Sequence, residues 1–203
     1  ILSCALSYAV NPLQYIPFNP CKQIKMPKLE KTKEEKRFII SPEDFQKIIE
    51  YFKDTPHYLP LMIGYYTGMR VNEVFALTWD DIDLNQRTIS VNKTLIREKL
   101  KEKGDSPWFF NSPKSDTSER TIPFGNTLYK ALKEAHRKKS LNRLKFGQNY
   151  IENYYEESIN QNGDPIRHLV FHPRSSGCGF PLADMVNVLD TGKYIGSDAM
   201  QHS

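Results

Sequence analysis

The sequence lacks the glycine-rich phosphate-binding motifs of nucleotide-dependent enzymes. Neither GxGxxG nor GxxxxGK[ST] occurs in its 203 residues, so nothing indicates a nucleotide cofactor. Its three cysteines are too few and too scattered for a disulfide scaffold or a zinc site, and they are typical of reduced thiols. No apolar run approaches the length that crosses a bilayer. We therefore expect a cytoplasmic protein with no membrane partner.

The sequence also offers little for a metal ion. Asp80, Asp81 and Asp83 form an acidic cluster, but a hard cation needs further oxygen ligands converging from elsewhere, and none is evident. Capping and turn roles explain these aspartates better. His172 and Arg174 resemble a catalytic pair only in composition, because their spacing in a proline-containing segment defines no relation between the side chains. We expect neither a metal nor a cofactor.

The net charge of +4 is concentrated in one segment. Residues 1–40 hold seven lysines and arginines against three glutamates, and the rest of the chain is balanced. A basic, proline-containing segment between two packed regions is what a linker lying along a polyanion looks like. Lys22, Lys25 and Lys28 are its candidates for contacts with such a polyanion. A flexible linker solvated by water explains the charge equally well.

The pattern divides the chain into three parts. Residues 1–20 are expected to be the end of an upstream helical domain, and residues 21–40 the basic linker. A second domain, 41–203, begins with SPED, which supplies a serine N-cap, a proline in the first turn and two acids at the positive end of a helix.

In this second domain, apolar residues at helical spacing predict four helices. The first begins at SPED and includes Phe52, the second covers about 58–66, the third begins near Arg70, and the fourth covers about 127–145. The basic face of the last helix is expected to be solvated. Alternating β-branched and aromatic residues predict a small three-stranded antiparallel sheet, drawn from the segments 82–96, 108–110 and 121–124.

The remainder of the domain is less regular. Residues 168–171 predict a short strand, and the polar, tyrosine-rich stretch 148–167 predicts an elaborated loop or an added helix. Ser197 and Asp198 are expected to cap a helix that stops after five residues, which is too short to be stable alone. The expected fold class is therefore α+β, mainly helical with a small sheet, and incomplete at its C-terminus.

Two basic residues have settings that suit chemistry. Arg70 follows the break Thr67-Gly68, and Glu73 lies where it can hold the guanidinium by a charge-assisted bond. An oriented guanidinium fork suits a phosphate. Lys114 lies at the tip of a turn between two strands, where it can reach a neighbouring groove. Arg–Glu pairs and hairpin lysines are also common for structural reasons, so the physics alone leaves both interpretations open.

A resemblance to a known family favours the functional interpretation. TGMRVNEVFALTWDDID, residues 67–83, is similar to the first arginine box of the tyrosine recombinases (phage integrases), which commonly reads T-G-x-R-x-x-E-x-x-x-L-x-W-x-D-I-D. Downstream, PKSDTSERTIP resembles that family's β-hairpin lysine segment, P-K-[ST]-x-x-[ST]-x-R-x-[IV]-P. The basic linker resembles the junction between core-binding and catalytic domains in integrases of conjugative transposons and prophages. The resemblance covers about residues 1–125 and, loosely, 165–203.

The resemblance implies a role for each matching residue. Arg70 would grip the scissile phosphate, Glu73 would support it, and Lys114 would be the general acid for the departing 5′-hydroxyl. Arg120 would contact DNA. The implied reaction is site-specific recombination, integrating or excising a mobile element through a 3′-phosphotyrosyl intermediate. Its implied partners are double-stranded DNA attachment sites and three further copies in a homotetramer.

The family's His-x-x-Arg box and nucleophilic tyrosine have no counterpart in the sequence. Tyr194 and His202 stand in the wrong order relative to the other motifs, so neither is the missing group. We therefore expect residues 41–203 to be the N-terminal portion of a catalytic domain that binds DNA weakly and does not cleave it. A non-catalytic DNA-binding remnant is the alternative. A type IB topoisomerase shares the chemistry, but the integrase-like linker argues against it.

Overall fold

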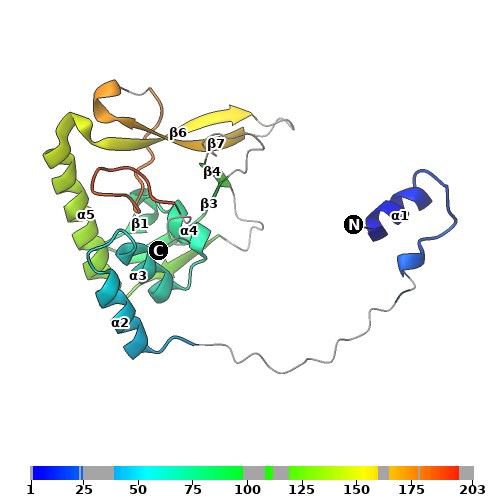
Figure 1. Cartoon of the computed structure of the whole chain (residues 1–203), viewed down its shortest axis with the longest axis horizontal. Coiled ribbons are helices and arrows are strands. Elements are labelled where there is room, and N and C mark those ends of the chain that lie inside the picture. The colour runs from blue at the N-terminus through cyan, green and yellow to red at the C-terminus, as the bar shows by residue number, and fades with distance from the viewer. Residues whose placement is uncertain are drawn as a thin grey trace. The chain divides into compact units, whose positions relative to one another are not determined.

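The computed structural model describes residues 2–22, 24, 39–97, 108–111, 119–159, 165–177 and 179–196. The chain separates into two compact units, 1–40 and 41–203. Figure 1 shows the elements of each unit. The three-part division expected from the sequence stays a prediction, because residues 25–38 of the linker lie outside the described residues.

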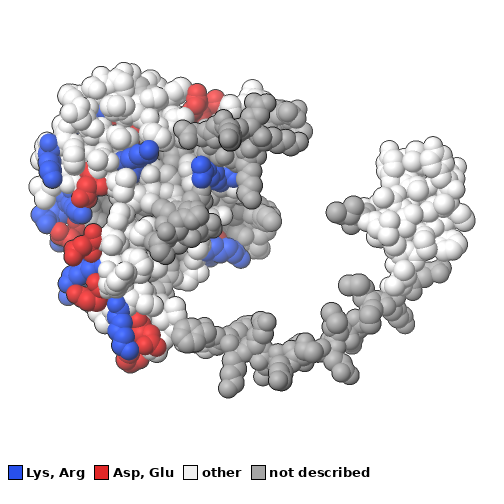
Figure 2. Space-filling view, in the orientation of Figure 1, with Lys and Arg blue, Asp and Glu red and all other residues white. Residues whose placement is uncertain are grey.

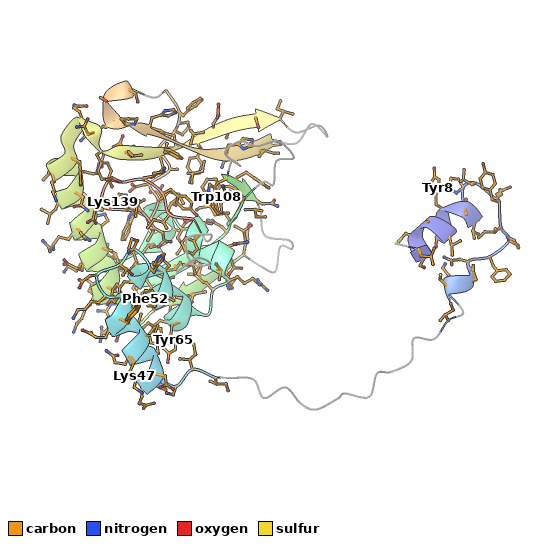
Figure 3. The ribbon with its side chains drawn as sticks, viewed as in Figure 1. Tyr8, Lys47, Phe52, Tyr65, Trp108 and Lys139 are labelled. Atoms are coloured by element: carbon orange, nitrogen blue, oxygen red, sulfur yellow. The ribbon has the colours of Figure 1, made fainter. Side chains whose placement is uncertain are left out.

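The first unit is a helix with a returning turn. It comprises α1 (Leu2–Val10) and the short 3-10 helix η1 (Pro20–Lys22). Asn19 is buried and joins them, because its Nδ2 donates to the Ser3 carbonyl and to Ser7 Oγ, each at 2.8 Å. No residue of α1 is buried, and large apolar side chains of this unit, including Tyr8 in Figure 3, are exposed.

The second unit contains the four helices that the sequence predicts. They are α2 (Pro42–Phe52), α3 (Tyr58–Thr67), α4 (Val71–Ala76) and α5 (Asn126–Phe146). Helices α2 and α3 pack through aromatic side chains: Phe45 stacks on Tyr65, labelled in Figure 3, with ring centroids 3.5 Å apart. The expected cap of α2 is confirmed, since Ser41 Oγ accepts from the Asp44 backbone N–H at 3.0 Å.

The Ser41 cap gives a first testable prediction. Ser41→Ala should lower the free energy of unfolding by about 1 kcal/mol, because the substitution removes a side-chain acceptor for an N–H group that has no partner within the helix. Urea denaturation followed by circular dichroism measures the change. Ser140→Ala, inside α5, is the control and should be neutral or slightly stabilising, because alanine favours helix interiors. Equal losses from both substitutions would contradict the capping role.

A three-stranded antiparallel sheet is present as predicted, but it contains only part of the predicted segments, because 94–96 and 108–110 lie in a second sheet. The three-stranded sheet contains β1 (Ile82–Asp83), β2 (Thr88–Val91) and β5 (Arg120–Pro123) in the order β1-β2-β5. Strand β2 is central, and its Val91 lies directly opposite Arg120 of β5.

A second, four-stranded sheet differs from the prediction. It contains β3 (Thr94–Arg97), β4 (Trp108–Asn111), β6 (Ile151–Ile159) and β7 (Pro165–Pro173) in the order β3-β4-β7-β6. The expectation of a loop or helix is wrong for residues 151–159 and 165–167, because β6 pairs with β7 along nine residues; residues 160–164 lie outside the described residues. The glutamates and the asparagine of β6 disfavour a strand by propensity, and pairing with β7 overrides them. Two short 3-10 helices flank this hairpin, η4 (Gly147–Asn149) and η5 (Arg174–Ser176).

Two hydrophobic clusters meet at the short helix α4. Val74 belongs to the cluster formed with α2, α3, α5 and the three-stranded sheet, whereas Phe75 and Ala76 belong to the cluster beneath the four-stranded sheet. Segment 179–196, red in Figure 1, fastens the end of α4: Asn187 Nδ2 donates to the Val74 carbonyl at 2.8 Å, and the Val186 N–H to the Leu77 carbonyl at 3.0 Å. Helix α4 is therefore held from several sides.

The exposed face of α5 is solvated, as expected, and two of its basic side chains also form ion pairs. Arg137 contacts Glu134 at 2.6 Å, and Lys138 contacts Asp190 at 2.8 Å. Figure 2 shows basic and acidic side chains intermingled along this side of the unit. Lys139 differs from the prediction, because its side chain is only 12% exposed and pairs with Asp184.

Candidate active site

Three residues shape the non-helical connection between α3 and α4 that precedes Arg70. Gly68 ends α3 in the left-handed region, with φ +64°, which an L side chain rarely adopts. Thr67 Oγ1 donates to the Ile63 carbonyl at 2.6 Å and accepts from the Met69 N–H at 3.3 Å. Met69 is buried in the core. The backbone therefore reaches Arg70 in a fixed direction, which explains why the arginine follows Thr-Gly.

Arg70 is the N-cap residue of α4, and Glu73 is the third residue of the helix. Glu73 Oε2 accepts from the Arg70 backbone N–H at 2.9 Å, as in the returning half of a capping box. Glu73 Oε1 accepts from Arg70 Nη1 at 3.1 Å. The ion pair expected from the sequence is present, and the same carboxylate holds both the backbone and the side chain of Arg70.

A second arginine binds the same carboxylate. Arg120, the first residue of β5, donates from Nη2 to Glu73 Oε2 at 2.8 Å and from Nη1 to Oε1 at 3.3 Å. The sequence did not predict this contact between residues 47 positions apart. The available signal was the arginine of the hairpin motif, whose partner cannot be read from its position.

The two arginines determine the charge state of Glu73. Burial alone would raise the pKa of the Glu73 carboxyl. Hydrogen bonds from Arg120, from the Arg70 N–H and from the Arg70 guanidinium outweigh burial and lower that pKa from 4.5 to about 2. The Glu73 hydrogen bond also raises the pKa of Arg120, against the effect of burial. Glu73 is therefore ionised at neutral pH, and the cluster carries two positive charges and one negative charge.

Exposure distinguishes the three side chains. The Glu73 side chain is 2% exposed, Arg120 is 34% exposed and Arg70 is 77% exposed. Glu73 thus forms the buried base of the cluster, while most of the Arg70 guanidinium faces solvent. An exposed, anchored guanidinium suits an anion with planar or tetrahedral oxygens.

The described structure does not test the other predicted site residues. Lys114, Lys25 and Lys28 lie outside the described residues. Lys22 ends η1 in the first unit. Their roles stay predictions.

The acidic cluster after Trp79 has the capping and turn roles expected of it. Asp81 is buried, and its Oδ2 accepts from the Thr78 N–H at 2.8 Å, while Lys93 Nζ approaches at 2.5 Å. Asp83 Oδ1 accepts from the N–H groups of residues 85 and 86, each at 2.8 Å. Among the described residues, no group of three or more His, Cys, Asp or Glu could hold a metal ion.

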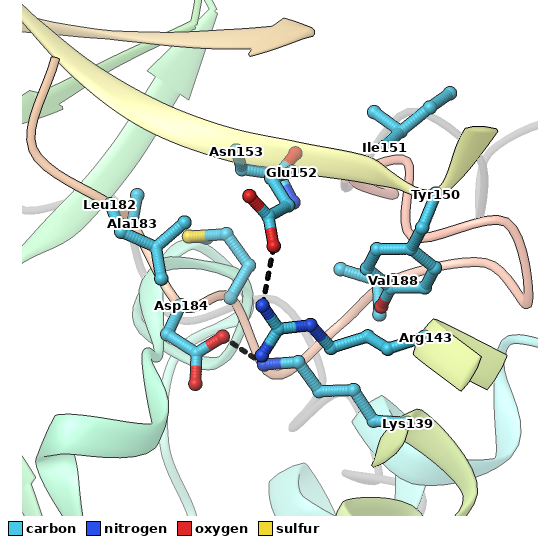
Figure 4. Close-up of a pocket in the computed structure, with 11 residues that line it drawn as sticks. Lys139, Arg143, Tyr150, Ile151, Glu152, Asn153, Leu182, Ala183, Asp184 and Val188 are labelled. Atoms are coloured by element: carbon cyan, nitrogen blue, oxygen red, sulfur yellow. Dashed lines mark hydrogen bonds and ion pairs between the residues drawn. The ribbon is translucent and has the colours of Figure 1, made fainter. Parts of the chain in front are cut away.

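A small polar cavity beneath α5 is a different site (Figure 4). Its volume of about 10 Å³ has room for about one water molecule. Its charges pair internally, because Arg143 contacts Glu152 at 2.5 Å and Lys139 contacts Asp184. Burial lowers the pKa of Lys139 more than Asp184 raises it. The ion pairs that line the cavity therefore join α5 to β6 and to segment 179–196. The cavity itself is too small for a substrate.

Three side chains considered from the sequence make structural contacts. Tyr194 is buried, and its ring packs edge-on against that of Trp108, which is labelled in Figure 3, with ring centroids 5.7 Å apart. Arg174 Nε lies 3.9 Å from Glu152, and the His172 ring lies 6.2 Å from that of Tyr154. His172 and Arg174 thus contact β6 rather than forming a catalytic pair.

Comparison with known proteins identifies the family. Residues 39–151 match the Phage integrase family, which is more than half of the chain and includes Arg70, Glu73, Lys114 and Arg120. The chain belongs to the phage integrase family. It is 30% identical over 156 residues to a "Tyrosine recombinase XerC-like" protein of Caldanaerobacter subterraneus subsp. tengcongensis, covering 74% of this chain and 40% of that protein. It is 26% identical over 99 residues to "Transposase from transposon Tn916" of Enterococcus faecalis, covering 47% and 23%.

Solved integrase structures share the fold of this family member. The Tn1549 transposon integrase in complex with transposon right end DNA aligns with a TM-score of 0.51 at 22% identity, covering 66% of this chain and 42% of that one. The same integrase with a circular intermediate DNA aligns with a TM-score of 0.58 at 17% identity, covering 97% and 51%. The chain thus spans at most about half the length of these relatives. No helix among its described residues is long and apolar enough to cross a membrane.

Proposed function

We propose that this integrase-family chain carries the first phosphate-binding arginine and the general-acid lysine of a site-specific DNA recombinase. The observation that supports this most strongly is Arg70, whose side chain is 77% exposed and yet anchored on a glutamate side chain that is 2% exposed. A surface arginine without function needs no buried counter-ion. The reaction would integrate or excise a mobile element.

The chemistry follows from the charge that a phosphate develops. A deprotonated tyrosine oxygen attacks the phosphorus, the P–O bond to the 5′-oxygen breaks, and the tyrosine becomes covalently linked to the 3′-phosphate. Negative charge grows on the non-bridging oxygens, and an oriented guanidinium stabilises it without a divalent ion. Lys114 donates the proton that the departing 5′-oxygen needs. The phosphotyrosyl link conserves bond energy for rejoining.

The nucleophile is proposed to lie outside this sequence, together with the His-x-x-Arg box. The chain alone would then hold part of an active site and bind DNA without cutting it. The solved relatives are integrases in complex with DNA, and a double-stranded attachment site is accordingly the proposed partner. Lys22, Lys25 and Lys28 are proposed as phosphate contacts, and a homotetramer as the working assembly.

A suicide attachment-site substrate tests this proposal. After cleavage, such a substrate loses a short strand, so the covalent protein–DNA adduct accumulates and is resolved on a denaturing gel. The longer recombinase that contains this sequence should form the adduct, and the 203-residue chain should not. Adducts from the 203-residue chain would contradict the missing nucleophile. Specific DNA binding without adducts from the longer protein would favour a non-catalytic DNA-binding protein instead.

A further inference from the structure

The second guanidinium on Glu73, that of Arg120, is expected from the sequence only to contact DNA. Arg120 holds both oxygens of the carboxylate, at 2.8 and 3.3 Å, with two nitrogens of one planar fork. A fork fixes the rotation of a carboxylate as well as its position. Arg70, in contrast, reaches Glu73 with one side-chain nitrogen at 3.1 Å. The orientation of Glu73 therefore depends more on Arg120 than on the Arg70 side chain.

Both ends of the Arg120–Glu73 bond lie on regular backbone. Arg120 is the first residue of β5 and lies opposite Val91, a buried residue of the central strand β2. Glu73 lies on α4 between the two hydrophobic clusters, next to the buried Val74. The bond thus fastens the edge of the three-stranded sheet to the start of the helix.

The Arg70 side chain would not be ordered by a single exposed contact. Exposed pairs with one contact contribute little and leave long side chains free to change rotamer. Here the acceptor is fixed, because Arg120 and the Arg70 backbone N–H both hold it. Building on the proposed function, we propose that Arg120 is a positioning residue, which fixes the Glu73 carboxylate so that the Arg70 guanidinium meets the phosphate in one orientation.

Direct contact with a DNA phosphate is the competing role for Arg120. The two roles differ in their dependence on salt. Loss of one phosphate contact should reduce the slope of log affinity against log salt concentration by about one. Loss of a positioning residue should leave that slope unchanged and slow the chemical step, because misplacement by about 1 Å costs on the order of 10²-fold.

The first measurement needs no DNA. In the 203-residue chain, ¹⁵N relaxation of the Arg70 Nε–H group reports how ordered the guanidinium is. Arg120→Gln should lower that order parameter, and Arg120→Lys should lower it too, because an ammonium keeps the charge but not the fork. Arg167→Gln is the matched control: it removes a strand arginine paired with Glu157 at 2.9 Å, and it should leave Arg70 unchanged.

The second measurement uses the longer recombinase. At saturating DNA, Arg120→Gln should slow single-turnover adduct formation at least tenfold, with the salt slope of binding unchanged. An unchanged Arg70 order parameter in the Arg120 variants would overturn the proposal. A slope of log affinity against log salt concentration that is reduced by about one, with a normal rate of adduct formation at saturating DNA, would also overturn it. If the wild-type recombinase forms no adduct, the proposed function fails, and the relaxation measurement still decides the role of Arg120. If Arg120→Gln does not fold, Arg120→Lys provides the test.

Discussion

In the longer recombinase that is proposed to contain this sequence, replacing Arg70 by glutamine should slow covalent adduct formation by about 10² to 10³-fold. This is the usual loss when one oriented donor to a developing oxyanion is removed. The expected loss appears at saturating DNA, because the guanidinium acts on charge that grows during the reaction. DNA affinity should fall much less, since Arg70 is proposed to supply only one of several phosphate contacts. Single-turnover adduct formation and a binding titration measure the two effects separately.

Arg137→Gln is a suitable control for this experiment. Arg137 also forms an ion pair with a glutamate three positions away in the chain, but both side chains are more than 60% exposed. Its replacement should leave adduct formation unchanged. Thermal unfolding should show that Arg70→Gln folds normally, because the side chain is mostly in solvent. A normal rate in folded Arg70→Gln would mean that Arg70 does not act on the phosphate.

The sequence predicted the local parts of this site because local rules determine them. Gly68 ends a helix in a conformation that glycine favours, and Glu73 reaches Arg70 because residues three apart on a helix are neighbours. The Arg120–Glu73 bond follows no such rule. It depends on the register of β5 against β2, which brings residue 120 beside α4 only after the sheet has formed.

The failure to predict the four-stranded sheet from the sequence has a similar cause. Strand β6 reads IENYYEESI, and its charged residues conceal the alternation that marks a strand. Pairing with β7 over nine residues, together with Asn153 Nδ2 donating to the Gly192 carbonyl at 3.0 Å, makes the strand. These partners lie on later segments of the chain, so propensity within a short window could not indicate them.

The stability of the second unit should depend on the ionised Glu73. Its pKa is about 2 in the folded protein against an ordinary value of 4.5, so the folded state favours the carboxylate. This stabilisation is fully present above about pH 4.5 and is lost as the pH falls from there through about 2. A depression of this size is worth about 3 kcal/mol. Glu73→Gln should therefore lower the free energy of unfolding by about 3 kcal/mol at pH 7.

Urea denaturation of both proteins across a range of pH values measures this effect. The gap between wild type and Glu73→Gln should narrow as the pH approaches 2, because protonation of wild-type Glu73 removes the same charge as the substitution. Glu157→Gln removes a carboxylate that is 61% exposed and pairs with Arg167, so its cost should stay below about 1 kcal/mol at pH 7. A gap that persisted unchanged at pH 3 would mean that the substitution destabilises the unit through packing. The ion pairs of Glu73 with Arg70 and Arg120 would then not be the source of the difference in the free energy of unfolding.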